Sequence, residues 1–246
     1  MGKVVSAEDT TETAVDRMWK ATSAFMHTLD AHPGWREFQK SRLRHAMDFD
    51  DVLPRQDSAT EFFEFPVEIA RQHDVVTLYL ELLDNVFSVK SCEYYFRRYP
   101  FRGLPVSRHE HLSNVCEMFF GRFYQFKERL KKYSGAVAAA SPENRLDFGT
   151  FINTFSKEFD QELRARNEIH HHRRFSDLSI EQIFISGALA DRWPDKSWNV
   201  EHRATYRKTA NEWALRAKNR GARLDAFMEA IADATLLSCS HFLLAP

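Results

Sequence analysis

The sequence is poor in the residues that make tight turns. Its 246 residues include only 8 glycines and 8 prolines, beside 21 phenylalanines. Few turns and many aromatic side chains favour long elements packed through their rings, which argues for helices over a β-sandwich. The balance of 43% hydrophobic and 28% charged residues is that of an ordinary globular protein.

Other absences exclude whole classes of protein. No run of 18 apolar residues occurs, so we expect no membrane partner. The net charge of −1 excludes a generally basic nucleic-acid-binding surface, so any anion must be bound by a local patch. The first residues lack the basic-then-apolar pattern of a secretory signal, which predicts a cytoplasmic protein.

Cysteine is also scarce. The three cysteines are scattered and odd in number, and Cys92 and Cys116 fall in predicted helices with apolar neighbours, whereas Cys239 lies near the chain end. This pattern predicts buried thiols in a reducing compartment rather than disulfides. The sequence also lacks a phosphate-cradling glycine loop, a nucleophile elbow and a paired-histidine zinc motif, so we expect no cofactor.

Apolar residues recurring every three to four positions predict an all-α fold. We expect helices at about residues 7–29, 35–47, 74–99, 108–132, from Ser141 to a basic cluster near residue 170, and at 179–190, 200–218 and 221–237. Residues 48–73 are the least regular and fit either a short edge strand or an extended arm. No linker divides the chain, which predicts a single domain over residues 1–246.

The densest group of anion-binding side chains lies between Arg164 and Arg174. Four arginines and three histidines occur in these eleven residues. The apolar stripe of the preceding helix, with Phe159 and Leu163, continues through Arg166 and His170 at steps of four, three and four residues. A charged side chain on a core-facing stripe is costly unless it is paired or faces a cleft or interface. This position predicts a functional site.

The run Arg166-Asn167-Glu168-Ile169-His170-His171 resembles the R-N-x-x-x-H form of the motif of the HEPN superfamily, the higher eukaryotes and prokaryotes nucleotide-binding domains. The resemblance implies a HEPN-like helical bundle at about residues 74–190, with additional helices at about 7–47 and 200–237. It also implies a homodimer that brings two motifs together, with Arg166, Asn167 and His171 at the motif positions.

The activity that the resemblance implies is metal-independent endoribonuclease cleavage of RNA by 2′-hydroxyl transesterification. A histidine would move the proton, and an arginine would hold the phosphate oxygens as their charge grows. Further contacts to the RNA backbone would come from Arg164, His172, Arg173 and Arg174. Family analogy alone suggests a defence or stress role, with an antitoxin or another protein as a possible partner.

Several alternatives stay open. On an ideal helix His170 lies about 40° from Arg166 and His171 about 140° away, so His170 fits the geometry and His171 fits the motif. The cluster could instead be a solvated helix cap, or part of a catalytically silent HEPN-like module that binds a protein or nucleotide. We expect no metal, because three consecutive histidines diverge on a helix. A second basic group in residues 203–223, which includes Arg216 and Arg220, is either a solvated face or more RNA-binding surface.

Overall fold

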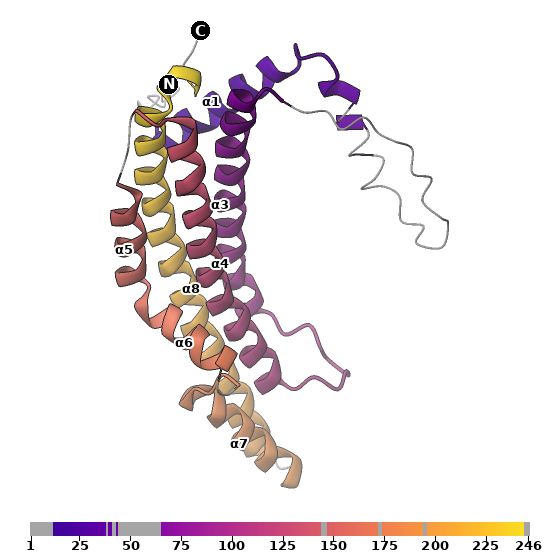
Figure 1. The fold of residues 1–246 in the computed structure, drawn as a ribbon. Helices are drawn as coiled ribbons and strands as arrows, with labels where there is room; N and C mark the ends of the chain where they lie inside the picture. Colours follow the sequence, from indigo (N-terminus) through magenta and orange to yellow (C-terminus); the bar gives the residue numbers. More distant parts are fainter. Residues whose placement is uncertain are drawn as a thin grey trace, which may run out of the picture. The chain divides into compact units, whose positions relative to one another are not determined.

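The computed structural model describes residues 12–37, 39–40, 43, 65–143, 147–171, 174–193 and 196–243. Within these residues all regular structure is helical and no strand occurs, which confirms the all-α fold (Figure 1). None of the described helices combines the length and the apolarity needed to cross a membrane. The helices are α1 Ala14–Leu29, α3 Val67–Arg97, α4 Arg108–Ala140, α5 Phe148–Glu158, α6 Asp160–His171, α7 Leu178–Arg192, α8 Lys196–Ser238 and α9 Ser240–Leu243.

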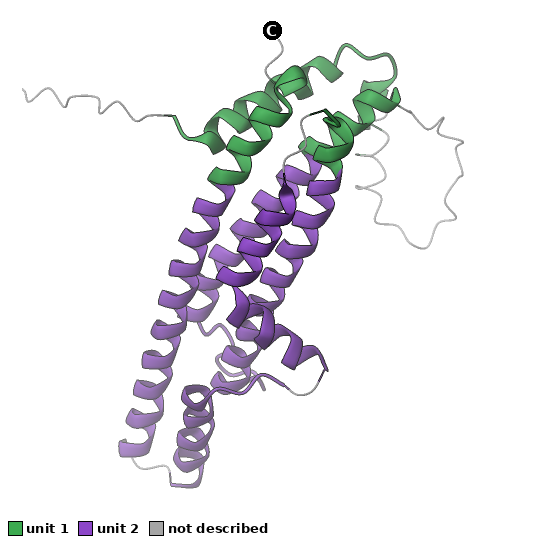
Figure 2. Cartoon of the chain, turned by 60° about the vertical axis from the view of Figure 1, so that its left-hand side comes forward, with its two compact units in different colours: residues 1–76, 136–146, 229–246 green, residues 77–135, 147–228 purple. Residues whose placement is uncertain are grey.

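The chain divides into two compact units, coloured separately in Figure 2. Unit 1 comprises residues 1–76, 136–146 and 229–246, and unit 2 comprises residues 77–135 and 147–228. The boundaries fall inside α3, α4 and α8, each of which contributes residues to both units. The single domain expected from the sequence stays a prediction.

Unit 1 is built around α1. Thr13 caps this helix through a reciprocal capping box with Asp16. The Glu229 carboxylate accepts hydrogen bonds from the backbone N–H groups of Ala14 and Val15, at 2.8 and 3.2 Å, and so satisfies two further donors at the helix start. Phe25 packs edge-on against the ring of Phe242, 5.6 Å away. Contacts distant in sequence therefore fix α1.

Unit 2 has a core of aromatic rings between its long helices. Figures 1 and 2 both show α3, α4 and α8 running side by side. The predicted stripe of α4 is buried as expected, with Phe119, Phe120, Phe123 and Phe126 at most 1% exposed. Phe126 stacks on a ring of α5, Phe155, at 4.9 Å. Offset and edge-on rings at such distances add stabilisation beyond their buried area.

Two glycines that looked like helix ends lie inside helices. The predicted end of the 108–132 helix at Gly135 is wrong, because α4 continues to Ala140. The predicted break before Gly221 is also wrong, because α8 is one helix of 43 residues. A Cβ atom at position 221 would lie 2.7 Å from Cγ of Lys90. Gly221 therefore permits the close approach of α3 to α8, and does not end a helix.

The helix predicted from Ser141 to the basic cluster is also wrong. Ser141 lies outside the helices, and its hydroxyl donates to the backbone carbonyl of Ser238. The helix begins instead at Phe148, capped by Asp147, which accepts a hydrogen bond from the Thr150 N–H. This bond and one from the Thr150 hydroxyl lower the pKa of Asp147. A second break at Phe159 separates α5 from α6.

Two weaker predictions fall partly outside the described residues. Of the helix expected at 35–47, residues 35–37, 39–40 and 43 are described and helical. Of the irregular segment at 48–73, residues 48–64 lie outside the described part, and residues 67–73 form the first turns of α3 rather than a strand or arm. The helix predicted at 179–190 begins one residue earlier, at Leu178. Asp177 caps it, and its side chain accepts hydrogen bonds from the N–H groups of Ser179 and Ile180.

The prediction of buried thiols is confirmed. Cys92, Cys116 and Cys239 are all buried and free. Burial disfavours the thiolate and raises the pKa of Cys92 to about 11 and that of Cys239 to about 12. Reactive cysteines have a lowered pKa and some exposure, so the properties of these thiols are those of core residues.

The α7–α8 pair carries a histidine that makes stability depend on pH. Burial and the nearby positive charge of Arg108 lower the pKa of His202 below its usual 6.5, and Nδ1 of His202 lies 3.1 Å from the Ser186 hydroxyl. The unfolded chain therefore binds a proton more readily at this residue than the folded chain does. Well above pH 6.5 His202 has no effect on the pH dependence of stability. As the pH falls below that value, protonation of His202 in the unfolded chain lowers the free energy of unfolding.

We expect the free energy of unfolding, from urea titrations at pH 7.5 and 5.5, to fall further in wild type than in His202→Gln. An equal fall in both proteins would contradict this assignment.

Candidate functional site

The predicted site lies on α6, which starts directly after the break at Phe159. Phe159 is fully buried, with its ring 4.9 Å from that of Phe123 and 4.8 Å from that of Phe155. The aromatic core thus fixes the start of α6. The helix then remains α-helical as far as His171. The rotation of an ideal helix therefore applies between Arg166 and His171, so these side chains point about 140° apart.

Arg166 is held by an aromatic ring of α4. Its guanidinium carbon lies 3.7 Å from the centre of the Tyr124 ring, which is a close cation–π contact. Its Nη1 donates to the Asn167 side-chain oxygen at 3.3 Å. Within the described part of the chain these are the contacts of Arg166, and neither partner carries a negative charge. The arginine is half-buried yet keeps its charge uncompensated.

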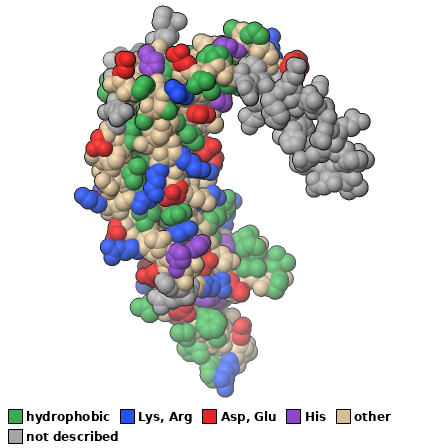
Figure 3. Space-filling view, in the orientation of Figure 1, with side chains coloured by type: hydrophobic (Ala, Val, Ile, Leu, Met, Phe, Trp, Pro, Cys, Tyr) green, Lys and Arg blue, Asp and Glu red, His purple; other side chains and the backbone are tan. Residues whose placement is uncertain are grey.

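The two described motif histidines are exposed at the end of the same helix. The ring centres of His170 and His171 lie 4.8 Å apart, at an interplanar angle of 69°. Figure 3 shows histidine and cationic side chains at the surface where α6 lies in Figure 1. His170 lies on the Arg166 side of the helix. His171 lies on the side of Arg164, seven residues earlier and about 20° away in rotation.

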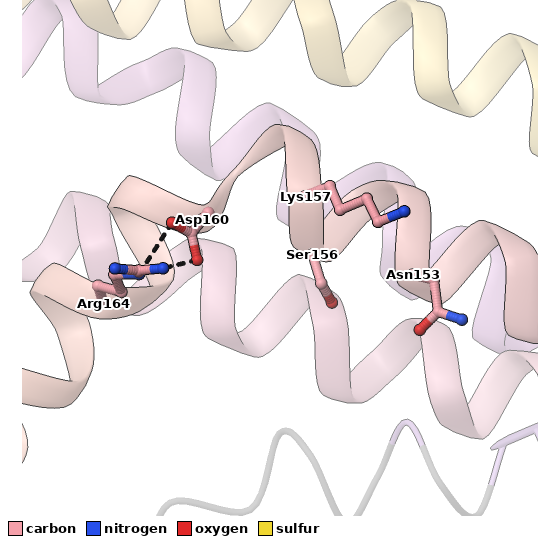
Figure 4. Close-up of a pocket in the computed structure, with 5 residues that line it drawn as sticks. All are labelled: Asn153, Ser156, Lys157, Asp160 and Arg164. Carbon is pink, nitrogen blue, oxygen red and sulfur yellow. Dashed lines mark hydrogen bonds and ion pairs between the residues drawn. The ribbon is translucent and has the colours of Figure 1, made fainter.

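Arg164 lines an open hollow on the outer side of α5 and α6. The hollow has a volume of about 580 Å³, and its lining is drawn in Figure 4: Asn153, Ser156, Lys157, Asp160 and Arg164. Nε of Arg164 lies 2.9 and 2.8 Å from the two carboxylate oxygens of Asp160. The guanidinium is therefore positioned through one nitrogen, and its two terminal nitrogens have donors to spare.

The other predicted RNA-binding residues follow α6. Arg174 is exposed, and its Nη2 donates to the Asn114 side chain at 3.0 Å, with the Glu117 carboxylate 3.9 Å from its Nε. Glu117 also accepts from the backbone N–H of Phe175 at 3.1 Å. These contacts tie the chain after α6 to α4. His172 and Arg173 lie outside the described residues.

A buried carboxylate lies beneath the motif. Glu162 is fully buried, and its Oε1 accepts from Arg216 at 2.9 Å and from Arg220 at 3.1 Å. These two arginines of the second basic group neutralise Glu162 from α8, a role that neither reading of that group from the sequence included. Glu162 is therefore paired with α8, and no ion pair joins it to Arg166 in the described part of the chain. Among the described residues, no three His, Cys, Asp or Glu side chains gather in a way that could hold a metal ion.

No family model, curated protein or solved structure matches this chain. The resemblance to the HEPN superfamily therefore depends on the six motif residues and the helical setting alone. What the site can do has to be argued from its own contacts and charges.

The residues that position the site were mostly missed in the sequence. Tyr124 lies one helical turn after Phe120, on the flank of the α4 stripe, and this spacing is the signal that could have found it. Asp160 lies four residues before Arg164, the ordinary spacing of a helical ion pair. The pairing of Glu162 with arginines more than 50 residues away has no local signal.

Proposed function

We propose that the chain is a metal-independent endoribonuclease of HEPN type, acting as a homodimer through Arg166, Asn167, His170 and His171. The observation that carries the proposal is the uncompensated charge of Arg166, held against Tyr124 on the same helix end as two exposed histidines. A cation without a carboxylate partner can bind a phosphate, whereas one already in an ion pair would have to give that pair up.

The reaction is a transesterification within the RNA strand. The ribose 2′-oxygen attacks the adjacent phosphorus, the bond from phosphorus to the 5′-oxygen breaks, and the products carry a 2′,3′-cyclic phosphate and a 5′-hydroxyl. One histidine of the 170–171 pair accepts the proton of the 2′-hydroxyl, and the other donates a proton to the departing 5′-oxygen. Arginine stabilises the charge that builds on the non-bridging oxygens.

Two chains are needed to complete this site. Arg166 and His171 point about 140° apart on one continuous helix, so a phosphate beside His171 is out of line with Arg166 of the same chain. A second copy facing it would supply Arg166 of the partner subunit. A role in defence or stress, with an antitoxin as partner, has support only from the resemblance.

The test is an assay of single-stranded RNA with EDTA present. We expect cleavage that leaves 2′,3′-cyclic phosphate ends, and none on DNA of the same sequence, which lacks the attacking hydroxyl. Absence of cleavage by folded protein on RNAs of mixed sequence would contradict the proposal. Cleavage that disappears with EDTA would contradict its metal independence.

A second candidate function is a catalytically silent module that binds a protein. The observation in its favour is the apolar surface of α7, directly after the motif, where Leu178, Phe184 and Ile185 are 84%, 58% and 55% exposed. Exposed apolar patches often mark protein interfaces. The same assay separates the candidates, because the silent module binds its partner and leaves RNA intact.

The Tyr124 ring offers a prediction about positioning. Tyr124→Ala removes the surface on which Arg166 rests, so we expect several-fold slower RNA cleavage, in line with the roughly 0.5–2 kcal/mol of a cation–π contact. Tyr124→Phe keeps the ring and should keep the activity. Equal losses in both variants would indicate that the hydroxyl, and not the ring, matters.

A further inference from the structure

We infer that the hollow between Lys157 and Arg164 is a subsite for a phosphodiester of the RNA strand, beyond the bond that is cut. The inference rests on the proposed function and extends it. It assigns a role to Lys157 and Asn153 of α5, which lie outside the motif. The hollow lies along the exposed side of α5 and α6, and Figure 4 draws the five residues that line it.

The charge of the hollow suits an anion. Its lining carries two cations, Lys157 and Arg164, and one carboxylate, Asp160, which leaves a net charge of +1. Asp160 engages only Nε of Arg164, so the carboxylate orients the guanidinium while the terminal N–H groups remain for a ligand. Among the described residues Lys157 has no carboxylate partner. In Figure 4 the Lys157 side chain extends away from Arg164, so the two cations are available to different phosphate oxygens along a bound strand rather than to one phosphate.

Neutral groups complete the lining. The Ser156 hydroxyl, which lines the hollow, donates to the backbone carbonyl of Ile152 at 2.7 Å, so its oxygen keeps the capacity to accept a hydrogen bond. The Asn153 side chain is exposed and offers both a donor and an acceptor. A phosphodiester linked to a sugar could use such groups beside its charged oxygens, because sugar hydroxyls both donate and accept.

The position of the hollow fits a strand that also crosses His171. Arg164 and His171 lie on one face of α6, seven residues and so about 10 Å apart along the helix. A few nucleotides of a single strand span that distance. The strand would pass His171, continue along the exposed face and reach the hollow near the start of α6.

Another hollow on unit 2, lined by residues of α8, is a poorer candidate. Its volume is about 440 Å³, and its arginines include Arg216 and Arg220 of α8. Both already pair with the buried Glu162, and Arg220 and Arg223 also lie within 4 Å of Glu158. A phosphate there would have to compete with these carboxylates. The available positive charge is therefore greater at Lys157 and Arg164.

The test measures binding of a fluorescent single-stranded RNA with 2′-O-methyl sugars, which keeps its phosphates and cannot be cut. Dissociation constants are measured over a series of salt concentrations for wild type, Lys157→Ala and the control Lys132→Ala, which removes an exposed lysine from α4. Loss of one phosphate contact lowers the slope of log K against log salt by about 0.7 and weakens binding about fivefold at 0.1 M salt. We expect both changes in Lys157→Ala and neither in Lys132→Ala.

The outcomes separate this inference from the proposed function. If wild type binds and cleaves RNA and Lys157→Ala keeps the wild-type slope and affinity, the subsite is wrong and the ribonuclease proposal stands. If wild type binds no strand, both are wrong. Binding of inorganic phosphate is measured as well. If wild type binds phosphate and Lys157→Ala does not, while both proteins bind the RNA strand equally, the hollow binds a free anion and is not an RNA subsite. Lys157 is exposed on a helix, where alanine is well tolerated, so the variant should fold.

Discussion

Replacing His171 with alanine should reduce kcat/KM for RNA cleavage by about 10²–10⁴-fold, the usual contribution of a general acid or base. His170→Ala should cause a loss of the same order, because the two rings lie 4.8 Å apart and share the two proton transfers. Arg166→Ala should cost about 10²–10³-fold through lost transition-state stabilisation.

The matched control is His241→Ala, which removes an exposed histidine from α9. Its activity should equal that of wild type. If His171→Ala retained full activity and His170→Ala lost it, the reaction would belong to the Arg166 face of a single helix. The argument for a second chain would then fail.

The largest effect on stability is expected for Glu162→Ala. Removing one partner of a buried ion pair typically costs about 3–5 kcal/mol, since the remaining charge loses its compensation. The side chains of Arg216 and Arg220 keep 36% and 23% exposure and can turn towards water, which places the cost near the lower end, at about 3 kcal/mol. For a chain of this size that lowers Tm by about 6–12 °C.

Glu158→Ala is the control for this measurement. Glu158 is 42% exposed and pairs with Arg220 and Arg223 at 3.5 and 3.8 Å. Such exposed pairs contribute at most about 1 kcal/mol. The two variants are compared by urea unfolding at pH 7.5. Equal stabilities would mean that Glu162 contributes no more than a surface ion pair.

The hydrophobic period and the composition were sufficient to predict the all-α fold, but not all the helix ends. The α4 stripe of phenylalanines is buried as its spacing indicates, because a 3.6-residue repeat allows one helical face to reach the core. Glycine was the misleading residue. Gly135 and Gly221 resemble helix ends in the sequence. Gly221 lies inside a helix, and glycine is required there because a Cβ atom at this position would collide with the Lys90 side chain of α3. That requirement arises only when α3 and α8 are already packed.

The motif cluster was found from the sequence, whereas its surroundings depend on tertiary packing. The apolar stripe of the preceding helix predicts that Arg166 lies on the helix face directed at the core, and in the structure Arg166 is half-buried. Its contact with Tyr124 joins residues 42 positions apart, and Glu162 is neutralised from 54 and 58 positions away. No local pattern encodes such pairs. The break at Phe159 was missed because its ring keeps the helical spacing while the backbone leaves the helix.

In the proposed mechanism RNA is cut at a site shared by two chains, with Arg166 from one and His171 from the other. The decisive measurement is RNA cleavage in EDTA by wild type, by Arg166→Ala, by His171→Ala, and by the two variants after they are unfolded together and refolded. Each variant alone should be nearly silent. Random pairing makes half of the dimers mixed, and one of the two sites in each mixed dimer is intact, so the mixture should recover about a quarter of wild-type activity. A wild type that leaves RNA intact, or a mixture as silent as its components, would contradict the claim.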